Sequence, residues 1–211
     1  MRNAPLVSVI IPTYKGAEES LSRAIDSVLN QTYQNIEVIV VDDNDPGTEE
    51  RRRTEMIMER YSDNNRVLYV KHERNRNAAA ARNTGFDNCN GDYICFLDDD
   101  DIFEPTKVAH QVAYLEEHPE YDAVYCGRFQ DGKTITYSKT GDLSEEILCM
   151  SFTPCTSSIM IRRDPYIILG GFDEQYRRHQ DFEFLLRFFE RFSIGAIELP
   201  LFTVKGNGID N

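Results

Sequence analysis

Four consecutive aspartates, Asp98 to Asp101, follow an apolar segment at residues 93–97 of this 211-residue chain. Ionised carboxylates repel one another, by about 1 kcal/mol for a pair roughly 4 Å apart in water and by more where water is excluded. A hard divalent cation such as Mg²⁺ or Mn²⁺ would offset this repulsion, because carboxylates at positions i and i+2 of a strand end can reach one ion. The run predicts either a cation site or a solvated acidic turn that caps the next helix.

Two other polar segments follow apolar runs in the same way. Residues 6–11 form a β-branched run that ends at Pro12, which cannot donate to a strand ladder, and Thr13 and Tyr14 come next. Residues 36–41 form a second β-branched run that leads directly into Asp42 and Asp43. Both runs have the composition of buried strands. The aspartate run is therefore one of three polar segments that follow predicted strands.

Helical patterns separate these strands. Apolar residues recur at helical spacing in residues 21–29, Thr48 can cap a helix that continues to about residue 61, and four alanines lie in a helix predicted for residues 75–90. A further strand is predicted at residues 67–71. Strands and helices that alternate over short connections form a Rossmann-like, mostly parallel sheet with helices on both faces. Because ligands bind at the carboxyl ends of such strands, the three polar segments are expected to meet at one edge.

The second half of the chain is less regular, and its predicted sheet is partly antiparallel. Asp131 and Gly132 form the turn of a predicted hairpin, and a short helix is expected to begin at Asp164 as N-cap and to end at Gly170. A strongly amphipathic helix is predicted for residues 180–192. The strands predicted in this half cover residues 123–126, 134–138, 157–161 and 194–199. No linker or repeat divides the chain, so we expect one α/β domain over residues 1–211.

Composition limits the classes of function. With 36 acidic and 23 basic residues, the net charge of −13 disfavours nucleic acid or an anionic membrane as the main electrostatic partner. The first five residues are too short and too polar for a signal peptide, and no apolar run has the length of a membrane span, which predicts a cytoplasmic protein. The five cysteines show no C-x-x-C spacing, so neither a zinc site nor a disulfide framework is indicated.

Six ordered motifs make the chain resemble the family 2 glycosyltransferases of GT-A fold over residues 6–187. These motifs are residues 6–14, 27–32, 39–43, 81–85, 91–101 and 170–173. The resemblance implies an inverting transfer of a sugar from a nucleoside diphosphate sugar, with UDP-sugar as the expected donor, to an acceptor hydroxyl. It also implies a place in the assembly of a surface polysaccharide.

By this resemblance, the aspartate run matches an Asp-x-Asp metal motif. Asp100 would bind Mn²⁺ or Mg²⁺ most directly. Asp98 would contact either the ribose of the donor or, through a water molecule, the metal. The cation would neutralise the charge that develops on the diphosphate leaving group. Asp99 is grouped with the nucleotide-binding residues but is expected to point away, since alternate strand positions face opposite sides. Asp101 is expected to be a helix cap or a supporting carboxylate.

The resemblance also implies a nucleotide-binding set. Pro12, Thr13 and Tyr14 match the loop that receives the base, where Tyr14 could stack on a pyrimidine and Asp43 could accept a hydrogen bond from the ring N–H. Arg82 could pair with a phosphate. The structural alternatives are a partly buried loop aromatic for Tyr14 and a solvated surface charge for Arg82.

The general base implied by the resemblance is Asp181. An acceptor hydroxyl is a poor nucleophile until its proton is taken. In the family a carboxylate at the start of a helix takes this proton, commonly within a Glu-Asp pair, and here Gln180 and Asp181 match that pair. The alternative is that Asp181 is the N-cap of the following helix, and both roles can hold together. His179 is expected to be a surface or acceptor-contact residue.

The chain departs from the family pattern after the last strand, where many relatives have a histidine. Lys205 and Asn207 stand there, and Lys205 could supply the positive charge. Alternatively, the sequence is part of a longer protein with a C-terminal acceptor-binding or membrane-associating region.

The expected halves are a nucleotide-binding part, about residues 1–101, and an acceptor-binding part, about residues 102–211. The expected acceptor is a glycan or lipid-linked glycan, peripheral association with the inner face of a membrane stays open, and the donor sugar and oligomeric state are not predicted.

Two other functions stay open from the sequence. A nucleotidyltransferase would share the acidic metal site, but it needs a Gly-rich basic loop after the first strand, and residues 12–19 contain one glycine and one lysine. A non-catalytic nucleotide-sugar-binding domain would have the same fold. Asp98, Asp100 and Asp181 together favour an enzyme over such a domain.

Overall fold

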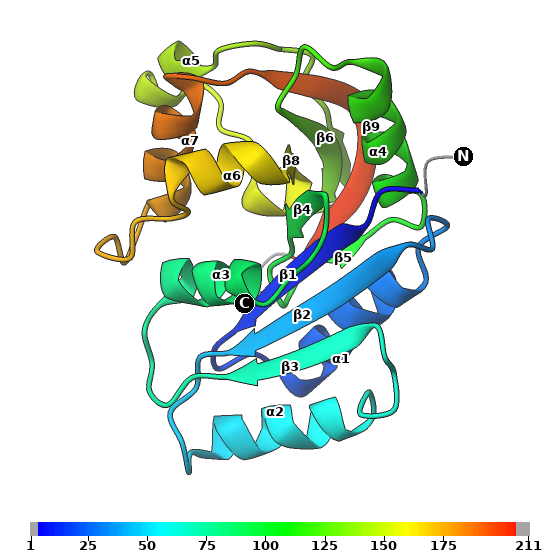
Figure 1. Cartoon of the computed structure of the whole chain (residues 1–211), viewed down its shortest axis with the longest axis vertical. Coiled ribbons are helices and arrows are strands. Elements are labelled where there is room, and N and C mark those ends of the chain that lie inside the picture. Colours follow the sequence, from blue (N-terminus) through cyan, green and yellow to red (C-terminus); the bar gives the residue numbers. More distant parts are fainter. Residues whose placement is uncertain (1–3, 206–211) are drawn as a thin grey trace.

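The computed structural model describes residues 4–205, and its first half alternates strands with helices (Figure 1). Thr48 caps the second helix as predicted, because its hydroxyl accepts a hydrogen bond from the Arg51 backbone N–H over 3.2 Å. The elements are β1 (Val7–Thr13), α1 (Glu18–Leu29), β2 (Ile36–Asp42), α2 (Glu49–Glu59), β3 (Val67–Lys71), α3 (Ala78–Asp87) and β4 (Tyr93–Phe96).

The second half mixes short strands and helices. Within residues 4–205, no helix is both long enough and apolar enough to cross a membrane. The elements are β5 (Ile102–Phe103), α4 (Lys107–Glu117), β6 (Ala123–Gln130), β7 (Lys133–Ile135), α5 (Ser144–Leu148), β8 (Met160–Arg162), α6 (Arg163–Leu169), α7 (Gln180–Phe189) and β9 (Ile194–Val204).

One continuous sheet runs through the described residues in the strand order β3-β2-β1-β4-β8-β6-β9-β5, with β7 paired to β6. Strands β3, β2, β1 and β4 are parallel neighbours. Strand β8 is antiparallel to both β4 and β6, whereas β9 is parallel to β6 and antiparallel to β5. The predicted α/β class, with an antiparallel part in the C-terminal half, is confirmed.

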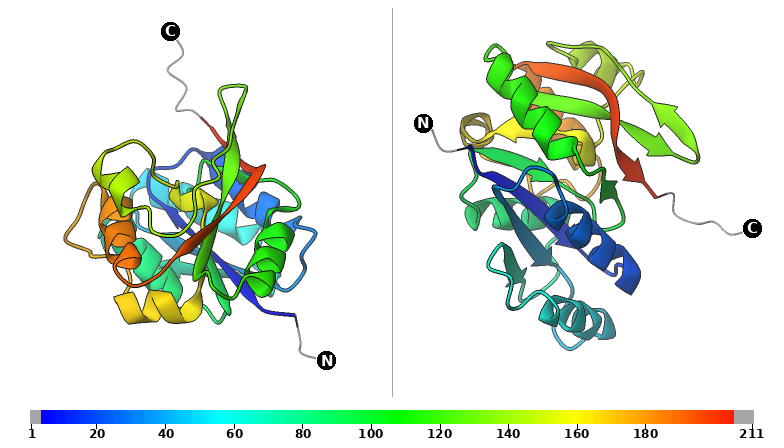
Figure 2. Two further views of the ribbon diagram at one scale, coloured as in Figure 1. Left: turned by 90° about the horizontal axis from the view of Figure 1, so that it is seen from above. Right: turned by 90° about the vertical axis from the view of Figure 1, so that its right-hand side faces the viewer.

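Helices cover both faces of this sheet, as the two views in Figure 2 show, and each face has its own buried apolar cluster. Helices α1, α2 and α4 pack on one face, and α3, α5, α6 and α7 pack on the other. Strand β1 lies between the layers, with Val9 and Ile11 in the first cluster and Ile10 in the second. This alternation follows from the two-residue period of a strand.

Helix α3 is shorter than the predicted 75–90. It begins after Asn77, whose side chain accepts a hydrogen bond from the Ala80 backbone N–H over 3.1 Å, and it ends at Asp87. The predicted end of this helix at residue 90, just before Gly91, is wrong. A Cβ atom at Gly91 would lie 2.6 Å from the backbone nitrogen of Ser8, so glycine is needed there for the close approach to β1.

Other differences lie in the second half. The residues predicted as a strand at 157–161 include a 3-10 turn, Thr156–Ser158, before β8 begins. The N-cap of α6 is Arg162 rather than Asp164, while its end at Gly170 in the left-handed region is as predicted. Strand β9 continues beyond the predicted 194–199 to Val204, because its last residues pair with β5. Neither β5 nor α5 was predicted. Both are too short to leave a periodic pattern in the sequence.

Candidate active site

The carboxyl ends of β1, β2 and β4 surround a cavity of about 470 Å³. Eight of its lining residues are those singled out from the sequence, and five are not. The predicted residues are Pro12, Thr13, Tyr14, Asp43, Arg82, Asp98, Asp99 and Asp100, and the others are Asn75, Asn77, Ala78, Ala81 and Arg177. The volume is in the range typical of small-molecule sites. Parallel pairing thus brings the three polar segments together, as predicted.

The four aspartates lie in a turn rather than in a strand. Strand β4 ends at Phe96, and the backbone N–H of Asp101 donates to the carbonyl of Asp98 over 3.0 Å. The prediction that Asp99 points away is wrong, because strand alternation no longer applies in this turn. Asp99 lines the cavity and accepts a hydrogen bond from the Thr13 hydroxyl over 2.5 Å.

Burial and mutual repulsion make these carboxylates harder to ionise. Burial raises the pKa of Asp99 to about 6, and Asp100 and Asp98 add to the shift while the Thr13 hydrogen bond opposes it. The pKa of Asp101 is raised to about 7, again mainly by burial, with hydrogen bonds from Ser157 and the Lys205 backbone opposing it. Asp101 is only 6% exposed, so the alternative of a fully solvated acidic turn is excluded. It is not a helix cap, since Thr106 holds that position for α4.

Asp100 differs from its neighbours in having free oxygens. The pKa of Asp100 is raised by burial and by Asp98, and within residues 4–205 its side chain accepts no hydrogen bond from another residue. The described residues contain no group of three or more His, Cys, Asp or Glu that could hold a metal ion. Magnesium-type sites commonly use one or two carboxylates together with substrate phosphates, so Asp98 and Asp100 fit a Mg²⁺ or Mn²⁺ ion that also contacts a diphosphate.

Arg82 is buried beside the aspartate turn. Its Nη2 donates to Asp98 Oδ1 over 2.8 Å, and its guanidinium lies 5.4 Å from the centre of the Phe172 ring. The side chain is only 5% exposed, so the alternative of a solvated surface arginine is wrong. Its Nε and Nη1 atoms have no hydrogen-bond partner among the described residues. Buried donors without partners are costly, which makes Arg82 a candidate for an additional anionic contact.

Asp43 holds the loop between β3 and α3. Its Oδ1 accepts from the Arg76 backbone N–H over 2.8 Å and lies 2.7 Å from Nδ1 of His72. Its Oδ2 accepts from the Asn75 side chain and the Asn77 backbone N–H, over 2.8 and 2.9 Å. These contacts use the roughly four acceptor positions of a carboxylate. A further hydrogen bond from a base would have to share an oxygen with one of them.

Asn77 is held in a backbone conformation that is almost restricted to glycine, with φ 98° and ψ 168°. Three contacts of this residue compensate the strain. Its N–H donates to Asp43, its side-chain oxygen caps α3, and its side-chain nitrogen donates to the Glu174 carbonyl over 2.9 Å. The loop that lines the cavity is therefore fixed from both sides.

Tyr14 presents an accessible ring to the cavity. The side chain is 45% exposed, so the alternative of a partly buried loop aromatic does not describe it well. Lys15 follows in the left-handed region, with φ 56°, and its backbone N–H donates to the Asn44 side chain over 2.9 Å. This bend directs the loop back across the end of β2.

Asp181 lies in the first turn of α7, outside the main cavity. It lines a small apolar recess with Phe96, Phe172 and Phe184. The N-cap of α7 is His179, so the alternative that Asp181 is the cap is wrong. The pKa of the Cys155 thiol is raised mainly by burial, and Asp101, Asp98 and Asp181 add to this shift. Asp181 and two aspartates of the turn thus contribute to the electrostatic environment of the same thiol.

A second loop, residues 173–179 between α6 and α7, also reaches the cavity, and in Figure 1 it extends toward α3. The Glu174 carboxylate accepts from Arg76 over 2.8 Å and from Asn83 over 3.2 Å. This anchor places Arg177 in the cavity wall. Sequence reasoning missed Arg177 because its only local signal is a polar segment before a helix. Lys205 is exposed, and Asn207 lies outside the described residues.

Comparisons with known proteins identify the family of the chain. The family model described as glycosyl transferase family 2 matches residues 8–191. The chain is 36% identical over 202 residues to an uncharacterized glycosyltransferase of Rickettsia prowazekii, a match that covers 90% of the chain and 61% of that protein. It is 32% identical over 196 residues to the amylovoran biosynthesis glycosyltransferase AmsB of Erwinia amylovora, covering 85% of the chain and 62% of AmsB. The chain thus spans less than two thirds of either relative.

The fold is also found in solved structures. The crystal structure of TarS residues 1–349 from S. aureus in complex with UDP-GlcNAc matches with a TM-score of 0.78 at 21% identity, over 96% of this chain and 59% of that one. Similarity at this level of identity concerns the fold alone. It confirms the predicted fold type.

Proposed function

The chain belongs to glycosyl transferase family 2, and we propose that it moves a sugar from a UDP-sugar to an acceptor hydroxyl with inversion at the anomeric carbon. The observation that carries the proposal is the cavity at the strand ends, which gathers an exposed aromatic ring, a buried arginine and the aspartate turn. The UDP-GlcNAc in the TarS complex supports a UDP-linked donor. The name of AmsB supports a role in polysaccharide biosynthesis, with a glycan or lipid-linked glycan as acceptor.

The donor would occupy the nucleotide-binding half, about residues 1–101. Pro12, Thr13 and Tyr14 would receive the base, with the ring of Tyr14 stacked on it. Asp43 would keep the loop of Asn75 and Asn77 in place as the opposite wall, because four contacts tie it to that loop. The unpartnered nitrogens of Arg82 support its contact with a phosphate.

A divalent cation, Mn²⁺ or Mg²⁺, would be held by Asp100 directly and by Asp98 and would supply positive charge to the diphosphate leaving group. Thr13 keeps Asp99 beside this pair. The raised pKa values of Asp99 and Asp101 support the need for positive charge at the turn.

Asp181 would act as the general base in the acceptor-binding half, about residues 102–211. It would take the proton of the acceptor hydroxyl as the oxygen attacks the anomeric carbon and the bond to the diphosphate breaks. A single displacement of this kind inverts the configuration. The helix that carries Asp181 is held by the stacking of Phe184 on Phe172, and Asp181 shares a recess with Phe96, which stands two positions before the aspartate turn.

Calorimetry of UDP binding with and without Mn²⁺ tests the donor site. In the wild type, Mn²⁺ should strengthen UDP binding, and Asp100→Ala should abolish this gain while the protein still melts cooperatively. Asp63→Ala, an exposed aspartate after α2, is the matched control and should behave as the wild type. Equal UDP affinity with and without Mn²⁺ in the wild type would contradict the metal assignment.

Asp181→Asn separates an enzyme from a non-catalytic binding domain. With the donor identified by a thermal-shift screen of UDP-, GDP- and dTDP-sugars, the variant should lose about 10²- to 10⁴-fold in the rate of transfer or donor hydrolysis. Its affinity for UDP should stay within about twofold of the wild type, because Asp181 lies outside the nucleotide cavity. An unchanged rate would favour the binding domain.

A further inference from the structure

The loop between α6 and α7 carries two arginines without partners. Arg177 and Arg178 are both exposed, and within residues 4–205 neither side chain takes part in a hydrogen bond or an ion pair. The loop therefore places two arginine side chains next to each other. Adjacent like charges repel, so this arrangement costs free energy unless an anion joins them.

The absence of partners stands out in so acidic a chain. With 36 acidic residues and a net charge of −13, arginines have many carboxylates to pair with. The other arginines near this loop do so. Arg76 binds Glu174, Arg82 binds Asp98 and Arg187 binds Glu183. Arg177 and Arg178 are thus the positive charges of this region that remain available to a ligand.

The backbone of the loop is held in place. Glu174 is anchored to Arg76, Asn77 and Asn83 of the neighbouring loop and helix. Asp173 closes the turn, since its carbonyl accepts from the Tyr176 N–H over 3.2 Å. At the other end His179 adopts the left-handed conformation, with φ 56°, and α7 begins. The two arginines therefore project from a fixed backbone.

The two arginines differ in position relative to the cavity. Arg177 lines the main cavity, whereas Arg178 is absent from its lining and stands three residues before Asp181. No side chain caps the N-terminus of α7, and a helix N-terminus favours anions. On α7, the next acidic residue after Asp181 is Glu183, and it forms an ion pair with Arg187.

We propose that Arg177 and Arg178 bind an anionic group of the acceptor, a phosphate or a carboxylate. This inference rests on the proposed function, which brings the acceptor hydroxyl to Asp181. The donor diphosphate already has Arg82 and the cation site, and a neutral acceptor would leave both arginines without a partner. A negatively charged acceptor would instead complete charge-assisted hydrogen bonds with both guanidinium groups, which stand four and three positions before Asp181.

Binding of small probes tests this site without knowledge of the natural acceptor. The probes are methyl phosphate, methyl glucuronide and the neutral methyl glucoside, titrated into protein saturated with UDP and Mn²⁺ and followed by NMR. The wild type should bind at least one anionic probe about 10-fold or more tightly than methyl glucoside. Preference for methyl phosphate would identify a phosphate-bearing acceptor, and preference for methyl glucuronide an acidic sugar.

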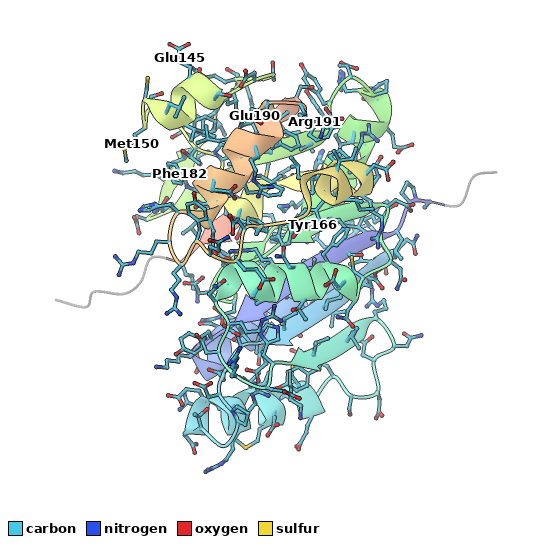
Figure 3. All side chains as sticks on the ribbon, turned by 60° about the vertical axis from the view of Figure 1, so that its left-hand side comes forward. Glu145, Met150, Tyr166, Phe182, Glu190 and Arg191 are labelled. Atoms are coloured by element: carbon cyan, nitrogen blue, oxygen red, sulfur yellow. The ribbon has the colours of Figure 1, made fainter. Side chains whose placement is uncertain are left out.

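The double variant Arg177→Gln/Arg178→Gln should weaken binding of that anionic probe by about 10- to 100-fold, on the scale of hydrogen bonds to charged groups. Replacement of both residues by lysine should restore part of the affinity. The matched control is Arg191→Gln. Arg191 is another exposed arginine, and Figure 3 shows it at the opposite end of α7 from Phe182. The Arg191→Gln variant should bind the anionic probe with the affinity of the wild type.

Three results would overturn the inference. Anionic probes could bind no more tightly than methyl glucoside, or the glutamine double variant could bind them as well as the wild type. The third result is that the double variant loses as much affinity for UDP as for the probe. The arginines would then bind the donor rather than the acceptor. Failure of the proposed function is a separate outcome, since the wild type would then fail to bind UDP with Mn²⁺ at all.

Discussion

At the scale of single residues, each aspartate around the cavity has a different environment. The carboxylate of Asp43 already accepts hydrogen bonds from the loop between β3 and α3, and Asp98 forms an ion pair with Arg82. Asp99 accepts a hydrogen bond from the Thr13 hydroxyl, whereas the side-chain oxygens of Asp100 accept none from another described residue. Identical side chains therefore differ in their availability to a ligand. Tyr14 is the aromatic residue of the cavity wall, and its side chain is 45% exposed.

Tyr14→Ala should weaken UDP binding by about 1 to 3 kcal/mol, the scale of base–aromatic stacking, which is roughly a 5- to 150-fold increase in Kd. Because the side chain is largely exposed, the melting temperature without ligand should hardly change. Tyr14→Phe keeps the ring and should retain most of the affinity. Calorimetry with UDP checks these values, and equal Kd values for Tyr14→Ala and the wild type would exclude stacking.

At the scale of elements, Tyr93 ties β4 to two of its neighbours. Its hydroxyl donates to Glu116 of α4 and accepts from Arg162 of β8 over 3.1 Å. Burial, followed by the hydrogen bond to Glu116, raises the pKa of Tyr93 to about 12, against an ordinary value near 10. This contact lies where the sheet changes from parallel to antiparallel pairing.

The shift predicts how stability depends on alkaline pH. Between about pH 10 and 12 the folded state keeps a proton that the unfolded state has lost. The stabilisation from Tyr93 is thus fully present below pH 10 and is lost as the pH rises toward 12. Urea unfolding of the wild type and Tyr93→Phe at pH 8, 9, 10 and 11 should show the wild type losing stability relative to the variant. A difference that does not change with pH would contradict this account.

At the scale of the whole molecule, the two halves that we propose to bind the nucleotide and the acceptor share one sheet. Strand β4 of the first half pairs with β8 of the second, and Glu174 binds Arg76 across 98 positions of the sequence. The two apolar clusters lie on opposite faces of the sheet rather than in separate halves. The halves should therefore fold as one unit.

Thermal unfolding should consequently be a single transition. Circular dichroism at 222 nm and the fluorescence of the 11 tyrosines, in a chain without tryptophan, should report the same midpoint. UDP with Mn²⁺ at about 100 times its Kd should raise both midpoints together, by roughly 5–10 °C for a domain of this size. Two separated midpoints would show that the halves unfold independently.

The sequence by itself determined the strand and helix order of the first half, the α/β class and the three polar segments at the ends of β1, β2 and β4. These features depend on short-range periodicity and on turn residues, which act over a few positions of the chain. The resemblance of the motifs added the family, and the comparisons confirmed it. The general base and the metal ligands stay predictions, although the structure places Asp98 and Asp100 in the cavity and Asp181 in a separate small recess.

Only the tertiary structure decided which partner each polar side chain has. The bond from Thr13 to Asp99 spans 86 positions, the contacts of Asp43 come from a loop about 30 positions away, and Arg177 reaches a cavity built mainly by the first half. The orientation of Asp99 was mispredicted because the strand ends before it. Local spacing carries no information on such pairs, because the packing of the sheet and its loops brings their atoms together.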